Sequence, residues 1–213
     1  MAEACARIGA ALIHLSTDYV FDGAKAGAYR EDDPIHPLSV YGASKAAGEA
    51  AVRERLDRAV ILRTSWVYAP IGRNFVRTML RLGAARDRIG VVDDQRGCPT
   101  SAADIARAIA TIAQALLTGH VDGFGTFHFC GGGDTTWYGF ARAIFAGAAA
   151  RGLKTPPTVT PIATADYPTP ALRPRNSVLD CGRIGRIHHI VPRPWPAALA
   201  ECLDEIAATI AAD

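Results

Sequence analysis

Residues 14–45 read HLSTDYVFDGAKAGAYREDDPIHPLSVYGASK, and the rest of the chain is organised around the polar residues in this stretch. The apolar run over residues 10–15 is too short for an independent helix and predicts a buried strand. This run stops at Ser16-Thr17-Asp18, three small polar residues where a strand of a parallel sheet would open into its ligand-binding crevice. Turn residues then mark a loop, and a helix is predicted from Tyr41 onward. The pattern therefore predicts a polar strand end followed by a helix whose first turn is also polar.

Tyr41 and Lys45 stand four residues apart, so on a helix their side chains share one face. A ketone that accepts a hydride also needs a proton on its oxygen, and a phenol becomes a useful donor when a nearby positive charge stabilises the phenolate. A hydroxyl at the strand end, from Thr17 or Ser16, can orient the same carbonyl oxygen. The Tyr–Lys pair alone also fits an amphipathic helix with a solvated lysine. The polar strand end favours the catalytic interpretation, with Tyr41, Lys45 and Thr17 as the catalytic residues.

Several longer motifs follow in order along the chain. They are STDYVFDG at 16–23 with Tyr41-x-x-x-Lys45, LRTSWVY at 62–68, NF at 74–75, DQ-x-G-x-PT at 94–100 and LRP-x-NS-x-LD at 172–180. Together they resemble the extended short-chain dehydrogenase/reductase family, and within it the reductases of dTDP-sugars. The resemblance covers essentially the whole chain. It implies hydride transfer from NADPH or NADH to the C4 ketone of dTDP-4-dehydro-6-deoxy-L-mannose, with Tyr41 as the proton donor.

The resemblance also assigns roles to single positions. It implies that the cofactor-binding residues are Ser16, Tyr41, Lys45 and Trp66, and that the substrate-binding residues are Thr17, Asp18, Trp66, Asn74, Arg173 and Asn176. Trp66 could instead be a core indole and Arg173 a solvated cation, although an arginine fork in a Pro-flanked loop suits a diphosphate. Thr100 could shape the pocket or cap the helix that follows it. No metal site is expected, because Ala103 and Pro196 stand where some relatives carry glutamates.

Strand and helix patterns alternate along the chain, which predicts an α/β fold with a parallel sheet. Strands are expected at 10–15, 59–62, 89–92 and 126–129, with a short one at Val159, and helices at 3–9, 41–52, 74–86, 102–117, 137–150 and 195–210. With the resemblance, this predicts an incomplete Rossmann-like parallel sheet with flanking helices in residues 1–132. A small C-terminal α/β portion that binds the substrate, residues 133–213, is expected to be interleaved with it.

No glycine-rich dinucleotide-binding turn occurs in the sequence. The motif G-x-G-x-x-G is absent, and Gly131-Gly132-Gly133 is interpreted as a loop because it lacks the third spaced glycine before the helix. We therefore expect the pyrophosphate-binding part of the family to lie outside this chain. We also expect an exposed strand edge that favours a homodimer.

Composition narrows the class of protein. The net charge is only +2 without a basic cluster, which argues against nucleic acid as a partner. Five scattered cysteines without a C-x-x-C spacing predict reduced thiols and a cytoplasmic protein. The absence of an apolar run of 18 residues argues against a membrane span.

Two other functions are compatible with the family resemblance. Sugar-nucleotide dehydratases follow their threonine with an Asp-Glu couple, whereas Thr17 precedes Asp18-Tyr19, so dehydration or epimerisation is disfavoured. A non-catalytic sugar-nucleotide-binding or regulatory subunit remains the alternative, because the glycine-rich turn is missing.

Overall fold

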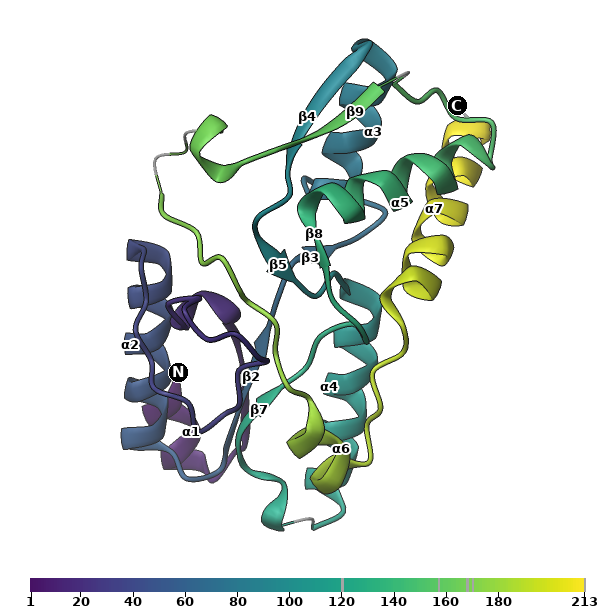
Figure 1. The fold of residues 1–213 in the computed structure, drawn as a ribbon. Helices are drawn as coiled ribbons and strands as arrows, with labels where there is room; N and C mark the ends of the chain where they lie inside the picture. Colours follow the sequence, from purple (N-terminus) through teal and green to yellow (C-terminus); the bar gives the residue numbers. More distant parts are fainter. Residues whose placement is uncertain (120, 157, 168, 170, 213) are drawn as a thin grey trace. The chain divides into compact units, whose positions relative to one another are not determined.

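The computed structural model describes the whole chain except residues 120, 157, 168, 170 and 213. Its contacts divide the chain into two interleaved units, each of which is described by itself (Figure 1). The first unit comprises Met1–Ser65, Ile105–Cys130 and Ala171–Pro192, and the second comprises Trp66–Asp104, Gly131–Pro170 and Arg193–Asp213. The predicted division between residues 132 and 133 into cofactor and substrate portions stays a prediction.

The first unit is built on a three-stranded parallel sheet. Its strands are β1 (Leu12–Thr17), β2 (Ala59–Thr64) and β7 (Gly125–His128), in the order β1-β2-β7. The predicted strands are confirmed, but β1 continues two residues further than expected and includes Ser16 and Thr17. Thr17 pairs with Thr64, so the two strands end level at the same edge of the sheet.

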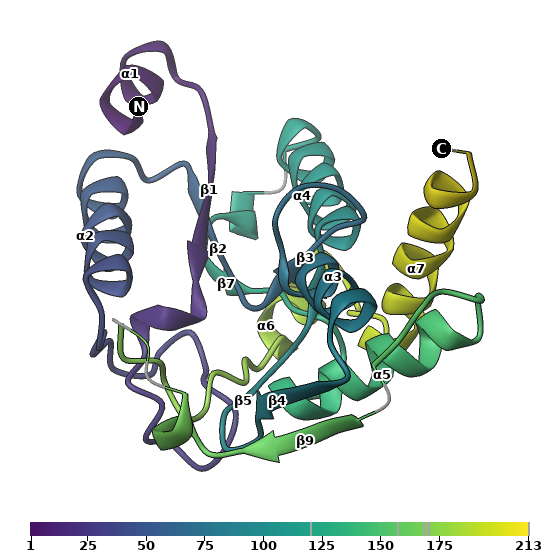
Figure 2. The ribbon, with the colours of Figure 1, turned by 90° about the horizontal axis from the view of Figure 1, so that it is seen from above.

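Helices cover both faces of this sheet (Figure 2). Strand residues alternate between the faces, so Ala59 and Ile61 pack against α1 (Ala2–Ile8) and α2 (Val40–Arg55), while Val60 and Leu62 face the other way. The second face is covered by α4 (Ala102–Leu117) and α6 (Gly182–His188), which bury Ile112 and Ile184. Both faces are therefore apolar along the middle of the strands, as expected for a parallel sheet.

A buried ion pair fixes α2 to the sheet. The Arg63 guanidinium of β2 donates two hydrogen bonds to the Glu49 carboxylate, of 2.9 and 2.7 Å, and the Ser16 hydroxyl of β1 donates a third of 2.5 Å. Burial alone would raise the pKa of Glu49, but the hydrogen bond and charge of Arg63 hold it below its ordinary value. Burial first, and then the charge of Arg63, lowers the pKa of the neighbouring His128 to about 3, so its ring stays neutral.

The second unit combines short strand pairs with three helices. The strands β4 (Arg88–Val92) and β9 (Thr158–Ile162) are parallel, as are β3 (Val67–Tyr68) and β6 (Thr100–Ser101), whereas β5 (Arg96–Gly97) and β8 (Thr135–Thr136) are antiparallel. The helices are α3 (Phe75–Ala85), α5 (Trp137–Ala149) and α7 (Trp195–Ala212). Their shared core contains Tyr68, Phe140, Ile144, Leu203 and Ile206.

The longer predicted elements are confirmed to within a few residues, and α4 has the predicted bounds. The helix α6 and the two-residue strands were not predicted. Thr100 belongs to β6, where its hydroxyl donates to the Cys98 carbonyl and accepts from the Gly131 N–H. The interpretation of Thr100 as a helix cap is therefore wrong.

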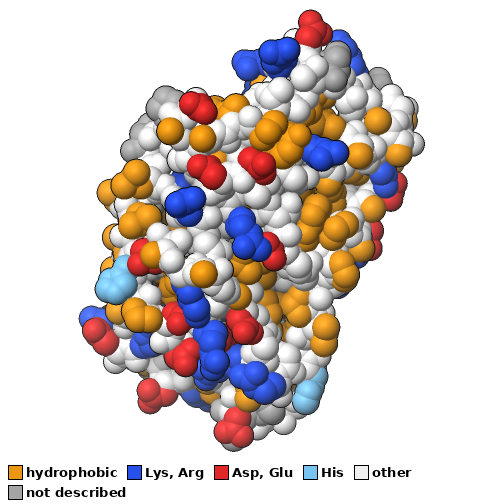
Figure 3. All heavy atoms as spheres, in the orientation of Figure 1, with side chains coloured by type: hydrophobic (Ala, Val, Ile, Leu, Met, Phe, Trp, Pro, Cys, Tyr) orange, Lys and Arg blue, Asp and Glu red, His pale blue; other side chains and the backbone are white. Residues whose placement is uncertain are grey.

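The described helices and the face shown in Figure 3 bear on two kinds of partner, membranes and nucleic acids. Among the described residues, no helix combines the length and the apolarity needed to cross a bilayer. On the face shown in Figure 3, basic and acidic side chains are interspersed.

Substituting Glu49→Gln keeps the size of the side chain but leaves the buried Arg63 without its counter-charge. We expect the free energy of unfolding, measured by urea denaturation, to fall by about 3–5 kcal/mol. Glu54→Gln is the control, because Glu54 lies on the same helix in an exposed pair with Arg55 and should change stability by less than about 1 kcal/mol. Equal effects of the two substitutions would show that the buried pair does not hold α2 in place.

Candidate active site

The end of β1 and the first turn of α2 meet in the first unit. A 3-10 turn, η1 (Asp18–Val20), follows β1 directly and packs against α2. The backbone approach is close, because a Cβ atom added at Gly42 would lie 2.2 Å from the Tyr19 carbonyl oxygen. The rings of Tyr19 and Tyr41 meet edge to face, with centroids 6.0 Å apart. The structure thus places Tyr41 beside the turn that immediately follows Thr17.

The Tyr41 hydroxyl and the Lys45 ammonium differ in their hydrogen bonding. Tyr41 is 55% exposed, and in the described part of the chain its hydroxyl has no hydrogen-bond partner. The Lys45 ammonium donates to the Leu15 carbonyl at 2.5 Å, two residues before Thr17. The predicted catalytic pair therefore has an open phenol and an ammonium held at the strand end.

Thr17 and Asp18 form a buried polar couple. The Thr17 hydroxyl donates to the Asp18 carboxyl at 2.9 Å and accepts the Tyr19 N–H at 3.2 Å. Burial raises the pKa of Asp18 to about 7, against the opposing hydrogen bonds from Ser177 and Thr17. The direction in which the Thr17 hydroxyl points its proton therefore depends on the charge of Asp18.

Ser16 lies on the opposite face of β1 from Thr17. Its hydroxyl belongs to the buried network of Glu49 and Arg63, and the residue is 4% exposed. The geometry gives Ser16 a structural role, and its predicted contact with the cofactor stays a prediction.

Arg173 and Asn176 lie on one segment but have different surroundings. The Asn176 amide is buried, donates to the Lys25 and Gly27 carbonyls at 2.7 and 2.9 Å, and accepts the Val178 N–H. Asn176 therefore holds the loop between β1 and α2 in place. A direct contact with the substrate stays a prediction for this residue.

Arg173 is exposed and lies near Tyr19. Burial and the Asp18 carboxylate raise the pKa of Tyr19 to about 12, and the Arg173 charge opposes that rise. Arg173 thus provides a positive charge close to the phenol of Tyr19.

Trp66 and Asn74 belong to the second unit. Trp66 has a positive φ of 45° and stacks on Trp137 with ring centroids 3.5 Å apart. The Asn74 side chain caps α3 by accepting the Arg77 N–H, and it donates to the Ala69 and Ile71 carbonyls. Predicted contacts of both residues with the nucleotide stay predictions.

Sequence reasoning missed Glu49, Arg63 and Tyr19. Glu49 continues the four-residue spacing of Tyr41 and Lys45 along one face of α2, and Arg63 is a charge inside an apolar strand. The sequence could have revealed Glu49 and Arg63, because a charged residue in a buried strand requires a partner of opposite charge. It carries no comparable signal for Tyr19.

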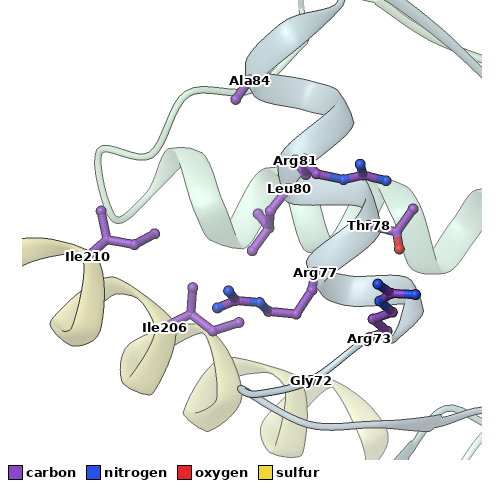
Figure 4. Close-up of a pocket in the computed structure, with 9 residues that line it drawn as sticks. All are labelled: Gly72, Arg73, Arg77, Thr78, Leu80, Arg81, Ala84, Ile206 and Ile210. Carbon is purple, nitrogen blue, oxygen red and sulfur yellow. The ribbon is translucent and has the colours of Figure 1, made fainter. Parts of the chain in front are cut away.

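A hollow of about 750 Å³ in the second unit lies between α3 and α7 (Figure 4). It is lined by Gly72, Arg73, Arg77, Thr78, Leu80, Arg81, Ala84, Ile206 and Ile210. None of the predicted site residues lines it. In the described part of the chain, no three His, Cys, Asp or Glu side chains are grouped to hold a metal ion.

Comparison with known proteins identifies the family. The profile of the RmlD substrate binding domain matches residues 1–208. The dTDP-4-dehydrorhamnose reductase of Aggregatibacter actinomycetemcomitans is 49% identical over 200 residues, which cover 93% of this chain and 68% of that protein. The chain belongs to the dTDP-4-dehydrorhamnose reductase family. The resemblance drawn from the motifs is thereby confirmed.

Solved structures of the dTDP-4-dehydrorhamnose reductase family share this fold. The Clostridium acetobutylicum enzyme has a TM-score of 0.87 at 37% identity, covering 95% of this chain and 68% of that one. The Bacillus anthracis enzyme, solved in complex with NADP, has a TM-score of 0.86 at 36% identity, covering 96% and 69%. The chain thus spans about two thirds of the length of these relatives. The predicted α/β fold with a Rossmann-like parallel sheet is confirmed.

Gly42→Ala tests the close approach of η1 and α2. The added methyl group would collide with the Tyr19 carbonyl, so we expect a loss of about 1–3 kcal/mol in the free energy of unfolding. Gly48→Ala on the same helix is the control, because the nearest atom to its Cβ lies 3.7 Å away and alanine favours a helix by about 0.5–1 kcal/mol. If Gly42→Ala and Gly48→Ala have the same effect on the free energy of unfolding, the close contact between Gly42 and the Tyr19 carbonyl is refuted.

Asp18→Asn tests the raised pKa of Asp18. A carboxyl with a folded-state pKa of about 7 and an ordinary value of 3.8 stabilises the fold most below pH 4. This stabilisation is lost as the pH rises from about 4 to 7, by up to about 4 kcal/mol. We therefore expect the unfolding free energy of the native chain relative to Asp18→Asn, measured in urea, to fall over that range and then level off.

Proposed function

We propose that this chain catalyses the NAD(P)H-dependent reduction of the C4 ketone of dTDP-4-dehydro-6-deoxy-L-mannose to dTDP-L-rhamnose. Support comes from relatives that are named for this activity and from a relative that binds NADP. The observation that carries the proposal is the exposed Tyr41 phenol beside the ammonium-anchored end of β1. These residues suit a nicotinamide cofactor, which supplies the hydride when it is bound.

Tyr41 donates the proton that the reduced carbonyl oxygen requires. Its hydroxyl has no competing protein partner among the described residues, so it is free to contact the substrate. The Lys45 ammonium stabilises the phenolate that remains, and its bond to the Leu15 carbonyl fixes it at the strand end. Its other two N–H donors have no hydrogen-bond partner among the described residues. A cofactor ribose would meet the same ammonium.

Thr17 orients the substrate carbonyl. Its hydroxyl can donate to that oxygen only when it does not donate to Asp18, so a protonated Asp18 favours the productive orientation. Arg173 contributes a positive charge near Tyr19, as a diphosphate requires. Asn176 supports this surface by holding residues 25–27.

A homodimer and a cytoplasmic location belong to the same proposal. The homodimer is supported by β1, which forms one edge of the three-stranded sheet, and by the 42% exposure of its Leu15. The cytoplasmic location is supported by the five cysteines, all of them thiols in the structure.

Tyr41→Phe is the decisive substitution. We expect the rate of NADPH oxidation with the dTDP-4-keto sugar to fall by at least about 100-fold, because the proton donor is lost. Binding of dTDP and NADPH, followed by fluorescence titration, should persist. Tyr167→Phe removes another exposed phenol and should leave the rate unchanged.

Two results would overturn this proposal. Undiminished turnover by Tyr41→Phe would exclude Tyr41 as the donor. If the native chain binds dTDP but neither binds nor oxidises NADPH, the non-catalytic binding subunit is the correct function.

A further inference from the structure

Two thiols that are far apart in the sequence touch in the first unit. Cys130 lies just after β7 and Cys181 just before α6, and their sulfur atoms are 3.5 Å apart. Cys130 is 2% exposed, whereas Cys181 is half-buried. The more exposed residue, Cys181, is therefore the one that a small reagent would reach first, and the buried Cys130 sulfur is its direct neighbour.

The thiol pair adjoins the segment that carries Arg173 and Asn176. The Cys130 sulfur also lies 3.8 Å from the Leu179 carbonyl. On either side of Leu179, the Tyr29 N–H donates to the Val178 carbonyl and the Asp180 N–H donates to the Tyr29 carbonyl. Backbone hydrogen bonds therefore hold the segment in a fixed place next to the two sulfurs.

We propose that Cys130 and Cys181 are a redox-active dithiol, which a peroxide oxidises to an intramolecular disulfide. The sulfurs need to approach by only about 1.5 Å to reach the bonding distance of about 2 Å. Such pairs, with an accessible thiol next to a resolving thiol, are the arrangement that senses oxidants.

The chemistry balances in two steps. The Cys181 thiolate attacks one peroxide oxygen, the O–O bond breaks, and a sulfenic acid forms. The hydroxide that leaves takes up the proton that the Cys181 thiol released on ionising, which gives one water. The Cys130 thiolate then attacks the Cys181 sulfur, the S–O bond breaks, and the departing hydroxide takes up the proton of the Cys130 thiol to give the second water. Two thiols are oxidised to one disulfide as hydrogen peroxide is reduced to two waters, and an external dithiol reverses the reaction by exchange.

A third thiol, that of Cys202, has surroundings that do not favour this reaction. Cys202 is 3% exposed, and burial raises the pKa of its thiol to about 11, so it holds little thiolate at neutral pH. Cys202 therefore provides a matched internal control.

The disulfide would join the end of β7 covalently to the segment of residues 173–181. Because the proposed function assigns Arg173 to substrate binding, closure should change the KM for the dTDP-sugar more than kcat. This consequence depends on the proposed function, whereas formation of the disulfide does not.

The test is treatment of the native chain with hydrogen peroxide, followed by alkylation, digestion and mass spectrometry. We expect a crosslinked Cys130–Cys181 peptide pair that lacks two hydrogens and the loss of two of the five thiols in a thiol titration. Dithiothreitol should restore both thiols. Five thiols remaining, or oxidation of Cys181 without a crosslink, would overturn the proposal.

Single substitutions assign the two roles. Cys202→Ser should form the crosslink as the native chain does. Cys130→Ser should accumulate a sulfenic acid at Cys181 that dimedone traps, and Cys181→Ser should form no crosslink while the Cys130 thiol remains. If Cys130→Ser does not fold, Cys181→Ser still tests the pairing, because Cys181 is only half-buried and its replacement should leave the fold intact. A crosslink in Cys181→Ser that joins Cys130 to another cysteine would refute the pairing.

Discussion

The arrangement of the candidate active site depends on the buried ion pair of Glu49 and Arg63. A carboxylate in the core is costly unless its charge and its lone pairs are matched, and here Arg63 and Ser16 both donate to it. The donors come from β2 and β1, and the acceptor comes from α2. The pair therefore determines how far along the sheet α2 lies, and with it the position of Tyr41 two turns earlier on the helix.

Apolar packing alone would define the position of α2 along the sheet less well than the ion pair does. Apolar side chains such as Val52 and Leu56 attach α2 to the sheet but tolerate small shifts along it. The charged network tolerates no such shift, since a displaced Glu49 would leave the Arg63 guanidinium buried without a partner. The polar groups thus define the exact position of α2 on the sheet, and the apolar side chains provide most of the free energy that holds α2 against it.

How much could be predicted from the sequence differs with the range of the interactions. The helix α4 was predicted with its observed bounds because its apolar periodicity is a local property. The two-residue strands β3 and β6 exist only because residues more than thirty positions apart pair with each other, and no local pattern marks them. Tyr41 and Lys45 are predicted as a catalytic pair from their spacing, which is also a local property. Substrate contact by Asn176 stays a prediction. That its amide holds the backbone at Lys25 and Gly27 could not be predicted, because this depends on how a distant loop folds back.

The hydrogen bond from Lys45 to the Leu15 carbonyl has a consequence for experiments on this protein. The ammonium that would assist proton transfer also ties the helix to the strand, so one side chain serves both the chemistry and the architecture. Removing it would disturb the position of the strand end as well as the charge. A loss of turnover after such a change would therefore mix two causes. Removing only the Tyr41 hydroxyl, which has no hydrogen-bond partner among the described residues, leaves the ring contact with Tyr19 intact and reports on the chemistry alone.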